Sequence, residues 1–195
     1  MKPKLITLSE HTVVSVKEDT QFVLDCANYV ADREYYFEAL FEKEGVSAEI
    51  LSAHNLRTGT VLNLTTIAHH KVAHTSCVIS VKSVLDDNAQ FSFVGKIIID
   101  KNAQQTSSFL NDNILVVGDA TKSNSQPILQ IDANDVSASH AATTGRVDAS
   151  QVFYLTSRGL SLREAEALII EGFFTSVLNK IPAGNVREKL AERVK

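Results

Sequence analysis

The sequence predicts a mainly β fold, a β-solenoid in which short strands stack as successive coils, followed by α-helices at the C-terminal end. Apolar runs rich in Val, Ile and Phe, each bounded by Asn, Asp or Gly, continue from Leu5 to about His140. Such runs are typical of strands. From Asp148 onward the apolar spacing changes to a helical period. We therefore expect a β-helix core over residues 1–147 and a helical segment over residues 148–195 in the same structural unit.

A recurring corner motif favours a solenoid over other all-β folds. In each copy a turn-favouring Asn or Asp precedes an alanine. These alanines are Ala89, Ala103, Ala120 and Ala133, spaced by 14, 17 and 13 residues. A corner followed by a small inward side chain suits stacked coils, because each coil buries its apolar face only against its neighbours. An up-and-down barrel or a sandwich also uses short, evenly spaced strands and is the alternative.

The strand-like runs are, in chain order, ITL, TVVSV, FVL, YYFEALF, VLNL, CVISV, FSFV, KIII, ILVV and PILQI. The fourth run is ambiguous. Between Asp32 and Glu42 the aromatic and apolar residues fit both the alternation of a strand and the stripe of a helix. The β-rich surroundings favour a strand there.

Composition narrows the functional classes. The chain has 195 residues and a net charge of −4, which argues against the clustered basic face that nucleic-acid binding needs. Its N-terminus has no signal-peptide apolar region, and no apolar run approaches the length of a membrane span. Cys26 and Cys77 have no close spacing, which fits a reducing compartment better than a disulfide framework. We expect a cytoplasmic protein that binds neither nucleic acid nor membrane.

The first predicted helix is short. Asp148 can cap a helix over Ala149–Ser157 through a capping box with Gln151, and Gly159 stands just past its end.

A second, longer helix follows, opened by a better capping box between Ser161 and Glu164. Its apolar arc is wider than packing on one face needs. The residues of this arc are Leu162, Ala165, Leu168, Ile169, Ile170, Phe173, Phe174 and Val177.

Pro182 and Gly184 end that pattern, and Asn185 can cap a last charged helix over Val186–Arg193. The simplest role for these helices is to cover the open end of the solenoid, since an uncovered sheet edge favours aggregation.

Catalytic signatures are missing from the sequence. It has no Gly-rich phosphate loop, no Gly-x-Ser-x-Gly motif and no recognisable cysteine nucleophile. The cluster His69, His70, His74 and Cys77 holds metal-ligand residue types, and on a strand His70 and His74 would point to the same side. Surface histidines in a turn beside a buried thiol are the simpler interpretation of this cluster.

His140 is the second candidate metal ligand. It lies between Ser139 and Ala141, near the end of the β-rich region. It is either a structural histidine on the last strand or a metal-seeking imidazole displayed where the strand stack ends. Spacing alone leaves both interpretations open.

A run of motifs from residue 91 onward is specific enough to compare with a known family. The motifs are FSFVGKIIIDKNAQQT (91–106), NDNIL (111–115), PILQIDANDV (127–136), SHAAT (139–143), GRVD (145–148) and FYLTSRGL (153–160). With the helical pattern of residues 164–174 they extend in register over roughly residues 72–180. The chain resembles the SufB/SufD family, the core scaffold of SUF iron–sulfur cluster assembly.

Within that family the chain looks like a short SufD-like member that lacks the usual N-terminal helical region. It keeps the histidine of the S-H-x-A-T motif as His140, whereas Ser139 and Ala141 stand where the SufB pattern has acidic residues. Asn111 stands where SufB carries its cysteine.

The resemblance implies a right-handed parallel β-helix and a non-catalytic scaffold subunit. Its β-helix would pair with a SufB-like or identical subunit, and a SufC-type ABC ATPase would dock on the C-terminal helices. The docking residues implied in this way are Phe153, Tyr154, Arg158, Gly159, Leu160, Glu164, Leu168, Glu171, Phe173 and Phe174.

The resemblance also makes His140 the candidate ligand for iron or a cluster at the subunit interface. Because Cys26 and Cys77 lie away from the family's cysteine position, we expect no tightly bound cofactor in the isolated chain. Iron or a transient iron–sulfur cluster would belong to the assembled complex. The alternatives are a β-helix carbohydrate-active enzyme, whose usual ladder of paired carboxylates is missing here, and a self-associating structural β-helix protein without a cluster role.

Overall fold

The computed structural model describes residues 1–26 and 33–195. The strands are β1 (Lys2–Thr7), β2 (Thr12–Val16), β3 (Thr20–Asp25), β4 (Glu34–Phe41), β5 (Ser47–Leu56), β6 (Val61–His70), β7 (Ser76–Leu85), β8 (Gln90–Ile99), β9 (Thr106–Val116), β10 (Lys122–Ile131) and β11 (Val136–Arg146). The helices are α1 (Ala149–Ser157), α2 (Leu162–Leu178) and α3 (Asn185–Arg193). The ambiguous segment forms strand β4, as predicted, although Asp32 lies outside the described residues.

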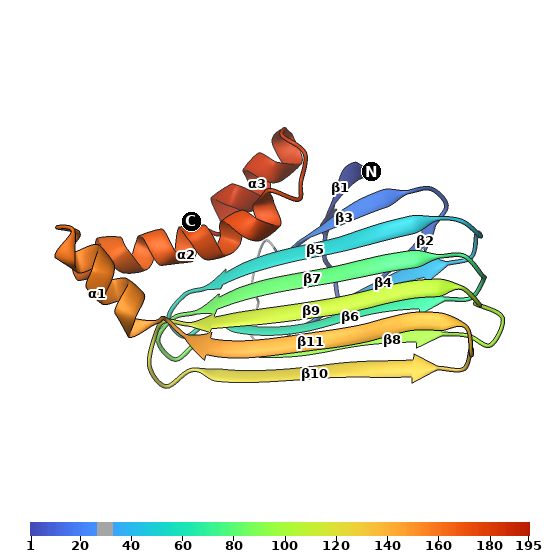
Figure 1. Cartoon of the computed structure of the whole chain (residues 1–195), viewed down its shortest axis with the longest axis horizontal. Helices are drawn as coiled ribbons and strands as arrows, with labels where there is room; N and C mark the ends of the chain where they lie inside the picture. The colour runs from blue at the N-terminus through green and yellow to red at the C-terminus, as the bar shows by residue number, and fades with distance from the viewer. Residues whose placement is uncertain (27–32) are drawn as a thin grey trace.

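The strands build a parallel β-solenoid with two sheets (Figure 1). One sheet, called sheet A, has the order β1-β3-β5-β7-β9-β11, and the other, called sheet B, has the order β10-β8-β6-β4-β2. Successive strands therefore alternate between the sheets, and each pairs in parallel with the strand two positions further along the chain. The predicted β-helix with C-terminal helices is confirmed, and the barrel and sandwich alternatives are wrong.

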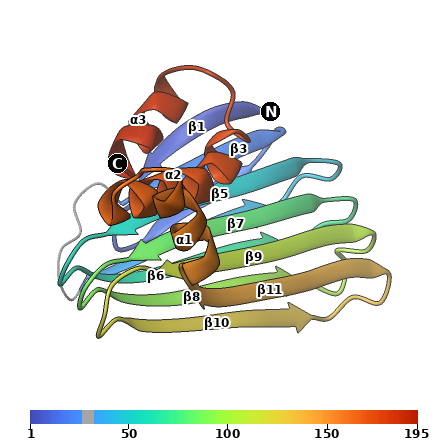
Figure 2. The same ribbon diagram turned by 60° about the vertical axis from the view of Figure 1, so that its left-hand side comes forward.

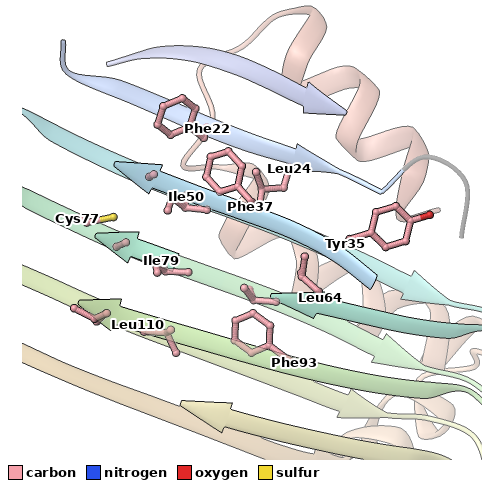
Figure 3. Packing of buried hydrophobic residues seen from close by; sticks show 14 of the residues in the cluster. Phe22, Leu24, Tyr35, Phe37, Ile50, Leu64, Cys77, Ile79, Phe93 and Leu110 are labelled. Carbon is pink, nitrogen blue, oxygen red and sulfur yellow. The ribbon is translucent and has the colours of Figure 1, made fainter. Parts of the chain in front are cut away.

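Side chains along each strand point alternately to its two faces. Those that point into the lumen, the space enclosed by sheets A and B, form the lumen row, and the others form the outer row. In β4 and β8 the lumen positions are buried while their neighbours are partly exposed. Aromatic side chains from both sheets fill this lumen, among them Phe22, Phe37 and Phe93 (Figure 3). Each such burial contributes about 1.5–3 kcal/mol, so the stacked rows supply most of the hydrophobic stabilisation of the coils.

Three of the four corner alanines behave as predicted. Ala89, Ala103 and Ala133 are buried, but Ala120 is exposed and has a φ of 53°. The exception is explained by register. Lys122 pairs with Gln90, so Ala120 takes the turn position of Asn88, which has a φ of 58°, and not the inward position of Ala89.

The helices cover the outer face of sheet A and not the open end of the solenoid, so the predicted location is wrong (Figures 1 and 2). The outer rows of β3, β5 and β7 carry apolar residues that need cover, and α2 and α3 pack on them. This second core contains Val23, Leu51, Ala53, Val84, Phe174, Val177, Ile181, Leu190 and Val194. Apolar burial there outweighs capping of the end.

The helix starts follow the predicted caps with one change. Asp148 caps α1 by accepting from the Ser150 N–H at 2.8 Å, and the reciprocal capping box between Ser161 and Glu164 opens α2. Asn185 is the first residue of α3, and Gly184 takes the cap position without a side-chain bond. Among the described residues, no helix is long and apolar enough to cross a membrane.

Candidate functional site

The end of the solenoid formed by β10 and β11 is the first candidate region. Each of these strands has a single sheet neighbour, β8 and β9 respectively. On β11 the residues that continue the lumen row, His140, Ala142 and Thr144, are exposed. The lumen row is therefore exposed to solvent on this last coil, at the edge that β10 and β11 share in Figure 1.

His140 lies in this accessible row. It pairs in register with Leu110 of β9, a buried lumen residue. Asn111 pairs with Ala141 instead and is exposed on the outer row of sheet A. The side chains of His140 and Asn111 therefore leave the sheet on opposite faces. The imidazole is placed at the rim of the lumen, separate from the predicted cysteine-equivalent position.

Asp112 is a feature of this end that the sequence analysis missed. It follows the lumen row of β9, and its side chain is 1% exposed. Within the described residues neither carboxylate oxygen makes a hydrogen bond of good geometry, and the Ser125 hydroxyl on β10 is a polar group that interacts with the carboxylate. Its place midway between Leu110 and Ile114, at the period-two spacing of a strand, was the signal that could have identified a carboxylate inside the lumen.

The surroundings of Asp112 favour its neutral form. Burial raises the pKa of Asp112 from 3.8 to about 6, and the nearby Ser125 hydroxyl lowers it only in part. Because the folded state then holds its proton more tightly than the unfolded chain, stability falls as pH rises through about 4 to 6. The cost persists at neutral pH and amounts to about 3 kcal/mol at most.

Asp112→Asn should therefore stabilise the protein at pH 7.5, by about 1–3 kcal/mol, and leave its stability nearly unchanged at pH 4. Urea unfolding at both pH values measures this difference. The matched control is Asp132→Asn, which removes an exposed carboxylate from the neighbouring corner. Wild-type and Asp112→Asn stabilities that change in parallel with pH would show that the carboxylate is not strained.

The histidine cluster of the sequence analysis is dispersed in the structure. His69 points outward, where its ring nitrogens lie 3.2 Å from Glu38 and 3.1 Å from Asp100. His70 points into the lumen and stacks on Phe41 with ring centroids 4.3 Å apart. Burial lowers the pKa of His70 to about 3, so its imidazole is neutral at physiological pH.

The other two members of that cluster lie apart from the first two. His74 is exposed in a turn with a φ of 57°, and Cys77 is buried on β7, where burial raises the pKa of its thiol. The expectation that His70 and His74 share one side of a strand is wrong. Within residues 1–26 and 33–195, no group of three His, Cys, Asp or Glu residues is placed to hold a metal ion.

The second candidate region is the hairpin of α1 and α2. None of the nine residues of α1 is buried by the described part of the chain, and α1 projects beyond the strand ends in Figure 1. Phe153 is 74% exposed, Tyr154 56% and Leu168 48%. A groove of about 380 Å³ lies between the two helices. It is lined by Ser150, Gln151, Tyr154, Leu155 and Ile169.

Several predicted docking residues also shape this hairpin. Gly159 ends α1 with a φ of 97°, a conformation that favours glycine. The Glu164 carboxylate accepts from the Ser161 N–H at 2.8 Å, which leaves it tied to the cap of α2. Arg158 lies over the Tyr154 ring, 5.2 Å from its centroid. Leu160 is half-buried beside them and Glu171 is exposed on α2.

Phe173 and Phe174 face the body of the protein. Phe173 is half-buried, and the Lys82 ammonium lies 4.1 Å from its ring centroid. Phe174 is 1% exposed and belongs to the core between α2 and sheet A. Its inclusion among the docking residues needs correction, because the outer rows of β5 and β7 already cover it.

Comparison with known proteins agrees with this geometry. A family model described as "SUF system FeS cluster assembly, SufBD core domain" matches residues 7–173. The chain belongs to the SufBD core family. This confirms the resemblance drawn from the motifs of residues 91–160.

Curated relatives with SufBD names are similar to part of this chain. SufD of Bacillus subtilis (strain 168), an iron–sulfur cluster assembly protein, is 38% identical over 107 residues, which is 55% of this chain and 24% of that protein. An iron–sulfur cluster assembly SufBD family protein of Synechocystis sp. is 34% identical over 163 residues, or 74% of this chain and 36% of that protein. SufD of Escherichia coli (strain K12) is 31% identical over 113 residues, or 58% and 27%. The chain thus spans less than two fifths of the length of these relatives.

The SufBD family match covers both candidate regions. The matched residues 7–173 include the rim of the lumen with His140, the buried Asp112 and the hairpin as far as Phe173. Motifs identified the segments that carry His140 and Phe153, whereas the orientation of each side chain depends on strand register and helix packing.

Proposed function

We propose that this SufBD-family chain is a non-catalytic scaffold subunit of a cytoplasmic iron–sulfur cluster assembly complex, on which the α1–α2 hairpin docks a SufC-type ABC ATPase. The observation that carries the proposal is the apolar surface of that hairpin. Phe153, Tyr154, Leu162 and Leu168 are all large and exposed. Surfaces of this kind mark interaction sites in soluble proteins.

The position of the hairpin suits a scaffold that responds to an ATPase. Strand β11 ends at Arg146 and α1 begins at Ala149, so only two residues separate them. If a bound ATPase moves α1, this movement would be transmitted directly to β11. Because β11 carries His140, nucleotide-driven motion would reach the rim of the lumen without passing through the buried core.

The end of the solenoid formed by β10 and β11 has features that favour pairing with a second subunit. Strand β11 is an unpaired edge of sheet A and carries no Asp, Glu or Lys over Val136–Gly145. The opposite edge, β1, carries Lys2, Pro3 and Lys4, residues that discourage strand addition. The proposed partner at β10 and β11 is a SufB-like subunit or an identical subunit, and iron or a transient cluster would form there beside His140.

Co-expression tests the proposed function. We expect the chain to co-purify with an ABC ATPase of the same assembly system and to stay bound through gel filtration at micromolar concentration. The ATPase paired with its own full-length scaffold is the positive control. Failure of the folded chain to bind this ATPase, while the control complex forms, would contradict the proposed function.

His140→Ala should lower the iron content of the assembled complex while leaving expression and thermal unfolding of the chain unchanged. Folding is insensitive because His140 is exposed at the rim. Iron assay of the co-purified complex, normalised to protein, gives the measurement. His74→Asn is the matched control, since His74 is an exposed histidine in a turn, where Asn tolerates the positive φ. Equal iron in the wild-type and His140→Ala complexes would leave His140 as a purely structural residue.

A further inference from the structure

We propose that Asp112 is a pH-dependent latch on the last coil of the solenoid, the coil formed by β10 and β11. The neutral carboxyl group keeps this coil closed, and the ionised carboxylate lets it open. Asp112 extends from β9 into the lumen, and its contacts toward the open end belong to the last coil, Ala142 on β11 and Ser125 on β10. Because Asp112 is 1% exposed, its carboxylate is hydrated only when this coil moves.

The lumen around Asp112 favours the neutral carboxyl group. Its neighbours along the lumen row of sheet A are Val81 on β7 and Ala142 on β11. Neither carboxylate oxygen makes a hydrogen bond of good geometry within the described residues, and the polar group that interacts with the carboxylate is the uncharged Ser125 hydroxyl. A single hydroxyl replaces little of the hydration that an ionised carboxylate loses on burial. The raised pKa of Asp112 agrees with this geometry.

No buried cation offsets an ionised Asp112 within the described residues. On β7, β8, β9 and β10 the lumen residues at the level of Asp112, and one lumen position to each side, are uncharged. On β11 the titratable side chain in this range is His140. Because His140 is exposed at the rim, its imidazole is hydrated whether the coil is closed or open. The balance between the two states therefore depends on the charge of Asp112.

The last coil is the part of the solenoid that opens at the lowest cost. Strands β10 and β11 each have one sheet neighbour within the described residues. Most of their lumen side chains are small or polar, whereas Phe91 and Phe93 fill the lumen on β8. Segments with few buried apolar contacts are the ones that open locally in folded proteins. Unfavourable burial of the Asp112 carboxylate therefore acts on β10 and β11 and not on the coils below them.

The direction of the pH effect follows from this burial. An open coil hydrates Asp112 and returns its pKa to about 3.8, whereas the closed coil raises it to about 6. The closed coil holds the proton more tightly, so it is favoured fully below about pH 4 and less as the pH rises to about 6. Above that range the loss is constant, and the open population is larger by about a hundredfold at most.

The latch controls how firmly the strand that carries His140 is held. Strand β11 contains His140 and forms the free edge of sheet A. At neutral pH this strand is loosened, and acidification fixes it. The latch belongs to the isolated chain and goes beyond the proposed function, because it needs neither an ATPase nor a paired subunit.

Hydrogen exchange of the purified full chain at pH 4.5 and pH 7.5 tests the latch. Protection factors are compared, because they correct for the intrinsic effect of pH on exchange. The probes are the Lys122 N–H, which donates to the Ala89 carbonyl at 3.0 Å, and the Val147 N–H, which donates to the Val116 carbonyl at 3.3 Å. Opening of the last coil breaks both bonds. In the wild type their protection should fall about 10- to 50-fold from pH 4.5 to pH 7.5.

Matched variants assign the effect to one carboxyl group. Asp112→Asn should remove this pH dependence and keep both probes protected at pH 7.5. Asp132→Asn changes an exposed carboxylate at the corner of the same coil and should retain the wild-type pH dependence. The Asp100 N–H, which donates to the His70 carbonyl at 2.9 Å in the coils below, is the internal reference and should respond to neither substitution.

Two results would overturn the proposal. One is an equal pH dependence of the probes in the wild type and in Asp112→Asn, which would assign the effect to other titratable groups. The other is protection of the wild-type probes that does not change with pH, which would show that the closed coil accommodates the ionised carboxylate. Either result leaves the proposed function standing, since ATPase binding is measured separately.

Discussion

Replacing Phe174 with alanine should destabilise the protein by about 3–5 kcal/mol, the range for large-to-small changes at buried aromatic positions. Phe174 is 1% exposed and packs with Val23, Leu51 and Val84 of sheet A. The substitution would remove contacts that hold α2 on the sheet and leave a cavity under the helix. Urea or thermal unfolding monitored by circular dichroism measures the loss.

The matched control for that prediction is Phe153→Ala on α1. Phe153 is an exposed aromatic residue of the same hairpin, so its removal should change stability by less than about 0.5 kcal/mol. Equal destabilisation by Phe153→Ala and Phe174→Ala would contradict the division between an exposed and a packed part of the hairpin.

Phe153→Asp should weaken binding of the ABC ATPase by about thirtyfold or more while leaving the fold intact. Large aromatic side chains at the centre of an interface often contribute 2 kcal/mol or more to binding, and Phe153 has the largest exposed fraction of the apolar side chains on the hairpin. An aspartate there adds a charge that must lose its water on docking. Calorimetric or surface-based titration of the purified ATPase gives the change in Kd.

Val13→Asp is the control for binding. Val13 is an exposed apolar residue on β2, far from the hairpin in the strand order of the solenoid. Its substitution introduces the same charge at a distant surface and should leave ATPase binding unchanged. If Phe153→Asp binds the ATPase as tightly as the wild type, the docking surface lies elsewhere on the chain.

These two predictions depend on a distinction that residue types alone do not make. Phe153 and Phe174 both occur in helices with apolar residues, and both belonged to the predicted docking set. In the structure one is free in solvent, whereas the other is covered by the outer row of β5 and β7. The difference comes from the way α2 lies across sheet A: the C-terminal half packs on the sheet, and α1 extends beyond it.

Local patterns in the sequence predicted most of the elements. Alternation of apolar residues predicted strands such as β4, because side chains of a strand point alternately to two faces. None of the predicted runs corresponds to β5, and β8 was predicted as two runs, FSFV and KIII. The serine and glutamate of the capping box predicted the start of α2 because their bonds are made within four residues. The motifs of residues 91–160 were sufficient to identify the SufB/SufD family, and the SufBD core family model, which matches residues 7–173, agrees with them.

Tertiary structure decided which surfaces are free and which side chains meet. Adjacent His69 and His70 leave β6 on opposite faces, and their partners Asp100 and Ser108 lie 31 and 38 residues away. The burial of Asp112 depends on what the neighbouring coils place around it. The location of the helices depends on apolar outer rows that, in sequence, look like ordinary strand residues. Strand register and helix docking set these contacts, and both are formed by segments far apart in the chain, which local patterns do not specify.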